Sequence, residues 1–219
     1  MMRIPTIARG LMLAATLALL AHVPARAQGG DEAPPVALAL GASAPMANAA
    51  LQNVDGKPVT IAGAAGKKGT LVIFICNHCP WVKAWQGRIA VLGNAAKAKG
   101  IGVIAINAND PEAYPEDAMA QMVKRAKDVG YRFAYAMDPT SNVARAFGAS
   151  HTPEAFLFDA RGKLVYHGAV DDNAQDVKAV KAHWLADAVT AVVAGKPVNT
   201  AETKALGCGI KFRAAATAN

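Results

Sequence analysis

Two cysteines separated by two residues carry the chemistry that this sequence most clearly offers. Cys76 and Cys79 lie in the segment CNHCP (76–80), directly after the apolar run 71–75. This order predicts that the pair opens a helix, where free backbone N–H groups and the helix dipole favour a thiolate over a thiol. A thiolate there is both a nucleophile and a leaving group. We therefore expect thiol–disulfide exchange, with Cys76 as the exposed attacking thiolate and Cys79 as the resolving thiol.

A purely structural disulfide between the two cysteines is the simpler interpretation. The loop that it would close is so short that the chain-entropy formula gives only about 2 kcal/mol of stabilisation. Adjacent cysteine pairs in exported proteins are more often redox-active than structural. The pair therefore predicts a redox-active centre.

The elements that must position the cysteines alternate between strand and helix. Hydrophobic periodicity and turn residues predict, in order, a hairpin over 52–61, a strand over 70–75, a helix ending near Gly100, a strand over 101–106, a helix over 116–129, a strand over 131–136, a helix over 141–147, a hairpin over 155–166 and a final helix over 172–194. Strands joined by helices, followed by a hairpin and a closing helix, predict an α/β fold with a mixed central sheet.

The N-terminus has the composition of a cleavable export signal. Arg3 and Arg9 precede an uncharged stretch over 10–23, and Ala25-Arg26-Ala27 fits a cleavage site. We expect a signal peptide over 1–27, a flexible leader over 28–36, a domain over 37–197 and a C-terminal tail over 198–219 that carries Cys208. Export places the chain in the periplasm or outside the cell, where disulfides persist, with no stable membrane insertion after cleavage.

The charge argues against a nucleic-acid partner. The formal net charge of +7 is small for 219 residues, and no basic run is longer than Lys67-Lys68. Nucleic-acid binding requires denser neutralisation of phosphates. The expected partners are protein or small-molecule thiols and disulfides together with a redox partner that the sequence does not identify, and the chemistry requires no dissociable cofactor.

The order of these motifs resembles thioredoxin over about residues 38–196, because CxxC follows the first core strand and Thr152-Pro153 precedes the later hairpin. The resemblance implies a thioredoxin-like fold with an N-terminal β-hairpin extension. It also implies that Pro153 is a cis-proline beside the cysteines and that Thr152 presents its backbone to a bound peptide.

Five separated segments are similar to the peroxiredoxin-like redoxins of the AhpC/TSA superfamily. They are FICNHCPWVK (74–83), AINAND (105–110), YPED (114–117), VDD (170–172) and GCGIKF (207–212). Members of that group often carry a cysteine just before the Thr-Pro, where this chain has His151. The resemblance implies an antioxidant thiol enzyme.

Two further hypotheses compete with thiol–disulfide exchange. A thiol-dependent peroxidase would need the arrangement P-x-x-x-T-x-x-C, but neither cysteine has the threonine and proline at the required positions. A copper-binding metallochaperone of thioredoxin fold could use Cys76 and Cys79 with His78 or His151, since thiolate and imidazole favour copper. Structural zinc would need a second ligand pair, which the sequence lacks.

Several other side chains are expected at the site. His78 could supply hydrogen bonds and charge to Cys76, and the disulfide-donating oxidases also carry a histidine before the second cysteine. We therefore expect a redox potential between about −270 and about −120 mV. Trp81 and Asn109 could line the substrate groove, as Asn109 follows a core strand at its carboxyl end. Cys208 is either a third redox thiol or a small buried residue that anchors the tail.

Overall fold

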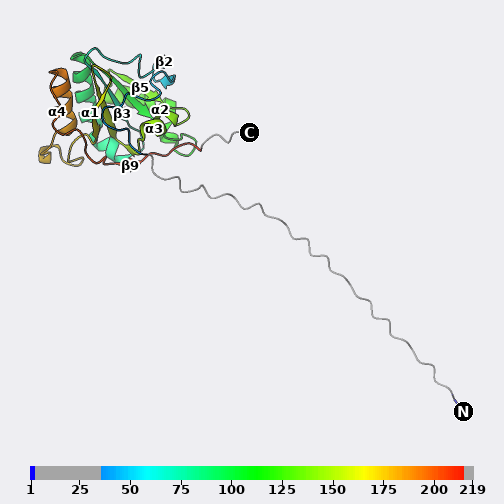
Figure 1. Ribbon diagram of the computed structural model, residues 1–219. Helices are drawn as coiled ribbons and strands as arrows, with labels where there is room; N and C mark the ends of the chain where they lie inside the picture. Colours follow the sequence, from blue (N-terminus) through cyan, green and yellow to red (C-terminus); the bar gives the residue numbers. More distant parts are fainter. Residues whose placement is uncertain (3–35, 215–219) are drawn as a thin grey trace. The chain divides into compact units, whose positions relative to one another are not determined.

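The computed structural model describes residues 1–2 and 36–214 (Figure 1). The predicted signal peptide and leader therefore lie almost entirely outside the described residues. Residues 36–214 belong to one compact unit. Among the described residues, no helix combines the length and the apolar character needed to cross a membrane.

A mixed sheet forms the centre of the fold. Its strands are β1 (Leu51–Asn53), β2 (Pro58–Val59), β3 (Gly69–Phe74), β4 (Ile101–Asn107), β5 (Ala134–Met137), β7 (Glu154–Asp159) and β8 (Leu164–Gly168). They lie in the order β2-β1-β5-β4 and β3-β7-β8, and β3 lies beside β4 through backbone bonds from Lys68 N to Gly100 O and from Ile75 N to Ile106 O. The β3–β4 and β4–β5 pairs are parallel, and the outer pairs are antiparallel. This arrangement confirms the predicted α/β fold and its N-terminal hairpin.

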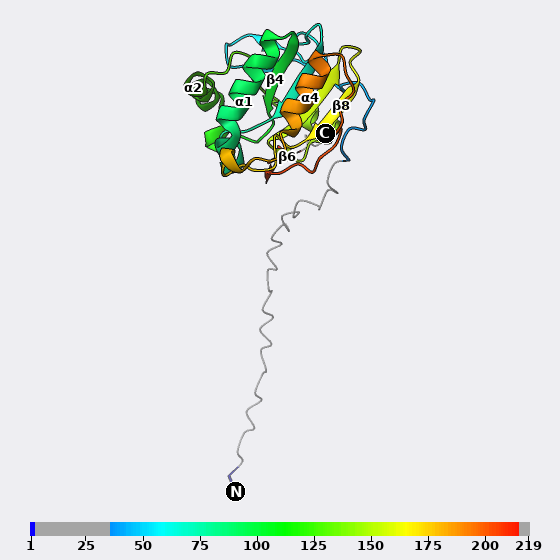
Figure 2. The same ribbon diagram turned by 90° about the vertical axis from the view of Figure 1, so that its left-hand side faces the viewer.

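Helices cover both faces of the sheet. The helices are α1 (Pro80–Ala98), α2 (Met119–Val129), α3 (Asn142–Phe147) and α4 (Trp184–Val193), with short 3₁₀ turns η1 (Pro115–Asp117) and η2 (Val177–Ala179). Helices α1, α2 and α4 contribute to one apolar cluster, whereas α3 and the segment before β3 contribute to the other. Figure 2 shows α1 and α4 together over one face.

Strand β3 is buried on both sides because it lies between these two clusters. Leu71 and Ile73 belong to the cluster with α1, and Val72 and Phe74 belong to the cluster with α3. Alternate side chains of a strand point to opposite faces, so a continuous apolar run is what a doubly covered strand requires. The strand delivers Cys76 to its carboxyl end.

Two predicted helices are too long. The helix expected over 116–129 is split into η1 and α2, because Ala118 is extended with ψ 153°. The helix expected over 172–194 is reduced to η2 and α4. Side chains of Asn173 and Asp176 accept backbone N–H bonds from the residues that follow them, and such turns compete with a helix. Val177 lies within the range of that predicted helix and is 62% exposed.

The C-terminal segment (residues 198–213) does not behave as a tail separate from the domain. It contains β9 (Cys208–Gly209), which pairs antiparallel with β6 (His151–Thr152). Further along, Lys211 N donates to Asn109 Oδ1 and Arg213 N donates to Ser141 Oγ. The segment is therefore hydrogen-bonded to the domain along much of its length and brings Cys208 into the fold.

Candidate active site

The two cysteines of the CxxC motif lie where β3 ends and α1 begins. Cys79 is the N-cap residue of α1, and Pro80 occupies the first helical position, where a missing N–H costs little. The expectation that Cys76 is exposed is wrong, since Cys76 is 1% exposed and Cys79 is 0% exposed. Neither cysteine of the motif is open to solvent in this arrangement.

Thr152 is in contact with both sulfurs. Its Oγ1 lies 3.2 Å from Cys76 Sγ, and its carbonyl oxygen lies 3.2 Å from Cys79 Sγ. The Thr152–Pro153 peptide bond is cis, as the resemblance implied. The strand edge that we expected to receive a peptide pairs instead with the chain's own β9, in the register Thr152↔Cys208 and His151↔Gly209.

The buried carboxylate of Glu154 holds the backbone that leads into β6. Glu154 Oε2 accepts the backbone N–H groups of Ser150 at 2.7 Å and His151 at 2.8 Å, and its Oε1 lies 2.6 Å from His167 Nε2. Both oxygens of the buried Glu154 are thus used. Because these bonds hold the backbone on the N-terminal side of Thr152, Glu154 positions the edge on which β9 lies.

Cys208 forms a third member of the sulfur cluster. Its Sγ lies 2.8 Å from Cys79 Sγ, and all three cysteines are free thiols. Cys208 is partly exposed, whereas the other two are buried. The approach depends on Gly207, because a Cβ at that position would lie 2.1 Å from the Thr152 carbonyl oxygen.

The negative charge of the cluster is favoured on Cys79. The hydrogen bond with Cys76 lowers the pKa of Cys79 to about 4, and contacts with Cys208 and the Val82 N–H act in the same direction. The same bond with Cys79, together with burial and the charge of Asp117, raises the pKa of Cys76. Burial and the neighbouring Cys79 raise the pKa of Cys208 to about 11. This distribution favours Cys79 as the ionised member of the pair, whereas we expected the thiolate on Cys76, and the roles of attacking and resolving thiol stay a prediction.

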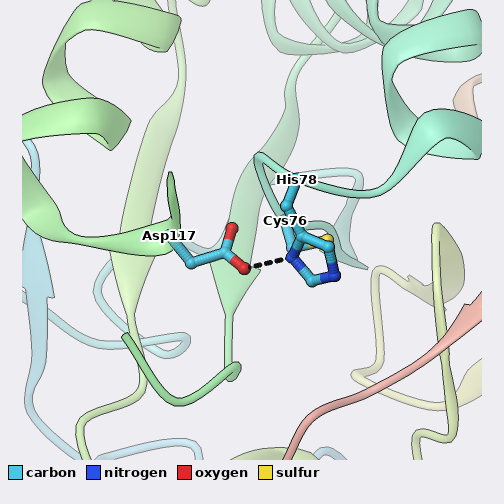
Figure 3. Close-up of side chains that lie close together, drawn as sticks. All are labelled: Cys76, His78 and Asp117. Atoms are coloured by element: carbon cyan, nitrogen blue, oxygen red, sulfur yellow. Dashed lines mark hydrogen bonds and ion pairs between the residues drawn. The ribbon is translucent and has the colours of Figure 1, made fainter. Parts of the chain in front are cut away.

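Asp117 is the residue around which the loop of the motif is built. The carboxylate is 0% exposed. Its Oδ1 accepts the Asn77 N–H at 2.5 Å and an Asn107 amide N–H at 3.2 Å. Its Oδ2 lies 2.6 Å from His78 Nδ1 and accepts an Asn109 amide N–H at 2.9 Å. Figure 3 shows Asp117 and His78 facing one another with Cys76 beside them. Sequence reasoning had assigned Asp117 no role, and only its place in the YPED segment marked it.

His78 lies between this carboxylate and the surface. Its ring stacks on Tyr114 with centroids 4.8 Å apart, and its side chain is 18% exposed. Asn77, the residue before His78, accepts two hydrogen bonds. Its Oδ1 accepts from Tyr135 Oη at 3.0 Å, and its backbone carbonyl oxygen accepts from Arg125 Nη2 at 3.0 Å. The motif is therefore held by side chains from η1, α2 and β5.

The remaining predicted site residues lie at different depths. Asn109 is 1% exposed, and its amide bonds Asp117 and the Lys211 N–H, so both of its ends support the site internally. Trp81 is half-buried and tilted against Trp85, with centroids 5.7 Å apart. His151 is half-buried, and its Nδ1 lies 2.8 Å from Ser150 Oγ.

One group of side chains within the described part of the chain has the spacing of a metal site. Donor atoms of Cys76, His78 and Asp117 lie within 4.8 Å of one another. This set differs from the expected copper ligands, because it includes neither Cys79 nor His151. Both oxygens of Asp117 already accept hydrogen bonds, so a metal would have to displace them.

The chain is similar to the thiol-disulfide oxidoreductase ResA of Halalkalibacterium halodurans, with 27% identity over 118 residues that cover 54% of this chain and 62% of that protein. The matched region thus spans less than two thirds of that relative's length.

Two solved structures are similar in fold. A hypothetical protein from Sinorhizobium meliloti 1021 has 36% identity and a TM-score of 0.75, covering 82% of this chain and 98% of that one. The thioredoxin domain of a thiol-disulfide oxidoreductase from Bacteroides vulgatus has 22% identity and a TM-score of 0.50, covering 60% and 89%. The second likeness concerns the fold alone, which is thioredoxin-like.

A family model matches most of the sequence. Residues 29–183 match the Redoxin family and include the CxxC motif, η1 with Asp117 and the cis Thr152–Pro153 bond. The likeness to the Sinorhizobium meliloti structure extends over nearly all of that protein. The chain belongs to the Redoxin family.

Proposed function

We propose that this protein is an exported thiol–disulfide oxidoreductase whose redox-active disulfide forms between Cys76 and Cys79. The observation that carries the proposal is the placement of both thiols at the N-terminus of α1, with the pKa of Cys79 lowered to about 4. A sulfur with a low pKa is both largely ionised and a good leaving group, which are the two properties that exchange requires.

The step is a two-electron exchange. In one direction, the Cys76 and Cys79 thiols become a disulfide, while a partner disulfide takes up two electrons and two protons and becomes two thiols. In the other direction, the protein disulfide is reduced and the partner is oxidised. The direction depends on the difference between the two redox potentials.

The supporting residues act by position. Asp117 holds the loop through the Asn77 N–H and holds the ring of His78 beside Cys76. Its charge near the buried Cys76 opposes ionisation of that thiol, which keeps the anion on Cys79. Thr152 lies against both sulfurs and fixes the distance between the loop and β6.

The compartment and partners belong to the same proposal. A signal peptide over 1–27 with cleavage after Ala27 would take the chain to the periplasm or outside the cell. The curated relative is itself named a thiol-disulfide oxidoreductase, which supports partners that carry thiols or disulfides. Disulfide chemistry between proteins is sustained in those compartments.

The experiment that tests the proposal mixes reduced protein with a disulfide-linked fluorescent glutathione dimer and counts the disulfides reduced at equilibrium. We expect one per wild-type chain, and the same stoichiometry for Cys208→Ser, which keeps the Cys76 and Cys79 pair. Cys79→Ser, made in the Cys208→Ser background so that Cys76 is the one cysteine left, should stop at a mixed disulfide and release half as much labelled glutathione as the wild type. Equal release from that double variant and the wild type would overturn the proposal.

A further inference from the structure

We propose that Cys208 is a second redox partner of Cys79, and that a Cys79–Cys208 disulfide passes oxidising equivalents between the buried motif and external thiols. This inference rests on the proposed function, because it assumes that Cys76 and Cys79 cycle. The two sulfurs are already 2.8 Å apart, and disulfide formation would bring them to about 2.0 Å.

The three cysteines differ in their exposure to solvent. Cys76 and Cys79 are buried, and Cys208 is the member of the sulfur cluster that reaches the surface. An external thiolate must approach along the axis of the disulfide that it attacks, so a disulfide buried at both sulfurs is a poor target. A disulfide between Cys79 and Cys208 would present one sulfur to solvent.

Backbone hydrogen bonds hold Cys208 in its place beside Cys79. Pairing of β9 with β6 sets Cys208 directly opposite Thr152, the residue that contacts both other sulfurs. Bonds from Ile210 N to Ser150 O at 2.9 Å and from Lys211 N to Asn109 Oδ1 at 2.8 Å continue this placement. The β9 strand thus occupies the edge on which a partner polypeptide would otherwise pair.

The chemistry balances in three exchanges. Starting from the Cys76–Cys79 disulfide, the Cys208 thiolate attacks Cys79 Sγ, a Cys79–Cys208 bond forms and Cys76 leaves as a thiolate. An external thiolate then attacks Cys208 Sγ, and Cys79 leaves as a thiolate. A second thiol of the external dithiol finally displaces Cys208, which leaves the protein with three thiols and the external dithiol as a disulfide.

Leaving-group ability favours the second of these exchanges, whereas the first depends on the 2.8 Å between Cys208 Sγ and Cys79 Sγ, because Cys76 is the poorer leaving group of the first disulfide. The pKa of Cys79 is lowered to about 4 and that of Cys208 is raised to about 11. A disulfide breaks faster when the departing sulfur has the lower pKa. Attack on the exposed Cys208 therefore expels the better of the two leaving groups.

The test maps disulfides after equilibration of the full protein in a glutathione buffer and acid trapping of free thiols. Trypsin places Cys76 and Cys79 together in the peptide 69–83 and Cys208 in the peptide 205–211. The two disulfides are therefore distinguished as an internal bond or a bond between peptides. In Cys76→Ser we expect the two peptides to be joined through Cys79.

Two glycine variants test the geometry, each introduced together with Cys76→Ser so that Cys79 and Cys208 are both kept. Gly207→Ala forces β9 away from Thr152, because its Cβ would lie 2.1 Å from the Thr152 carbonyl oxygen. The matched control is Gly209→Ala, whose Cβ has its nearest neighbour at 3.9 Å. Misplacing one reacting sulfur should reduce the equilibrium yield of joined peptides about tenfold or more in Gly207→Ala, with little change in Gly209→Ala.

Failure of the Cys208 step and failure of the proposed Cys76–Cys79 cycle give different disulfide patterns. If the internal Cys76–Cys79 bond forms in the wild type and in Cys208→Ser, while Cys76→Ser gives only glutathione adducts, the inference fails alone. If the internal bond forms in neither protein, the proposed function fails. Joined peptides in Cys76→Ser that are lost with Gly207→Ala and kept with Gly209→Ala establish the Cys208 step.

Discussion

Replacing Asp117 by asparagine should both destabilise the protein and change its thiol chemistry. The carboxylate is fully buried and receives four hydrogen-bond contacts, two at each oxygen. An asparagine has one acceptor oxygen, and its NH₂ group would face the two donors on the other side. The substitution therefore leaves one side of the carboxylate site, with its two hydrogen-bond partners, without an acceptor oxygen.

The magnitude follows from those two donors. A buried donor left without an acceptor costs about 1–3 kcal/mol, so two of them cost about 2–6 kcal/mol. We expect Asp117→Asn to lower the free energy of unfolding by about 2–6 kcal/mol. For a domain of this size, that corresponds to a fall in Tm of roughly 4–24 °C.

The second effect is on Cys76. The charge of Asp117 raises the pKa of the Cys76 thiol, so its removal should shift ionisation of that thiol to lower pH. The assay combines urea unfolding of the reduced protein, followed by circular dichroism, with the pH profile of alkylation at Cys76 read by peptide mass spectrometry.

The matched control is Asp128→Asn, since this aspartate pairs with Lys124 on the surface of α2 and its side chain is 54% exposed. A surface pair contributes about 0–1 kcal/mol, so the control should change little. The reasoning is refuted if Asp117→Asn costs no more than Asp128→Asn and leaves the alkylation profile of Cys76 in place.

Two further predictions address the thiolate and the helix. Contact with Cys208 lowers the pKa of Cys79, so Cys208→Ala should move the thiolate absorbance near 240 nm to higher pH; an unchanged or lower midpoint would contradict the charge distribution. Gly87→Ala, on the exposed side of α1 with nothing near its Cβ, should stabilise the protein by about 0.5–1 kcal/mol. Gly93→Ala in the same helix should destabilise it, because its Cβ would lie 2.5 Å from the Phe133 ring, and thermal unfolding of the two variants should move in opposite directions.

The sequence was sufficient for the parts of the fold that depend on local pattern. The apolar run of β3, the helix that starts at Pro80 and the cis bond implied by the thioredoxin resemblance at Pro153 are all present. The final helix was overextended because Val177 and Val180 fit a helical period, although the side chains of Asn173 and Asp176 form turns there. Hydrophobic periodicity does not register such side-chain bonds.

The sequence identified the two cysteines of the site but not the residues that hold them in place. CxxC spacing identified Cys76 and Cys79, whereas Asp117 reaches them from a turn 38 residues beyond Cys79. The nearness of Cys208 to Cys79 depends on the long-range pairing of β9 with β6. A pairing between two-residue strands this far apart leaves almost no trace in local composition.

The redox potential of the Cys76–Cys79 pair tests the central claim most directly. It would be measured on the protein lacking residues 1–27, by glutathione equilibration with mass-spectrometric trapping, for the wild type and for Cys208→Ser. The account predicts a reversible two-electron couple in both proteins, with a potential between about −270 and about −120 mV. Failure of the pair to cycle, or a potential well below about −270 mV, would contradict it.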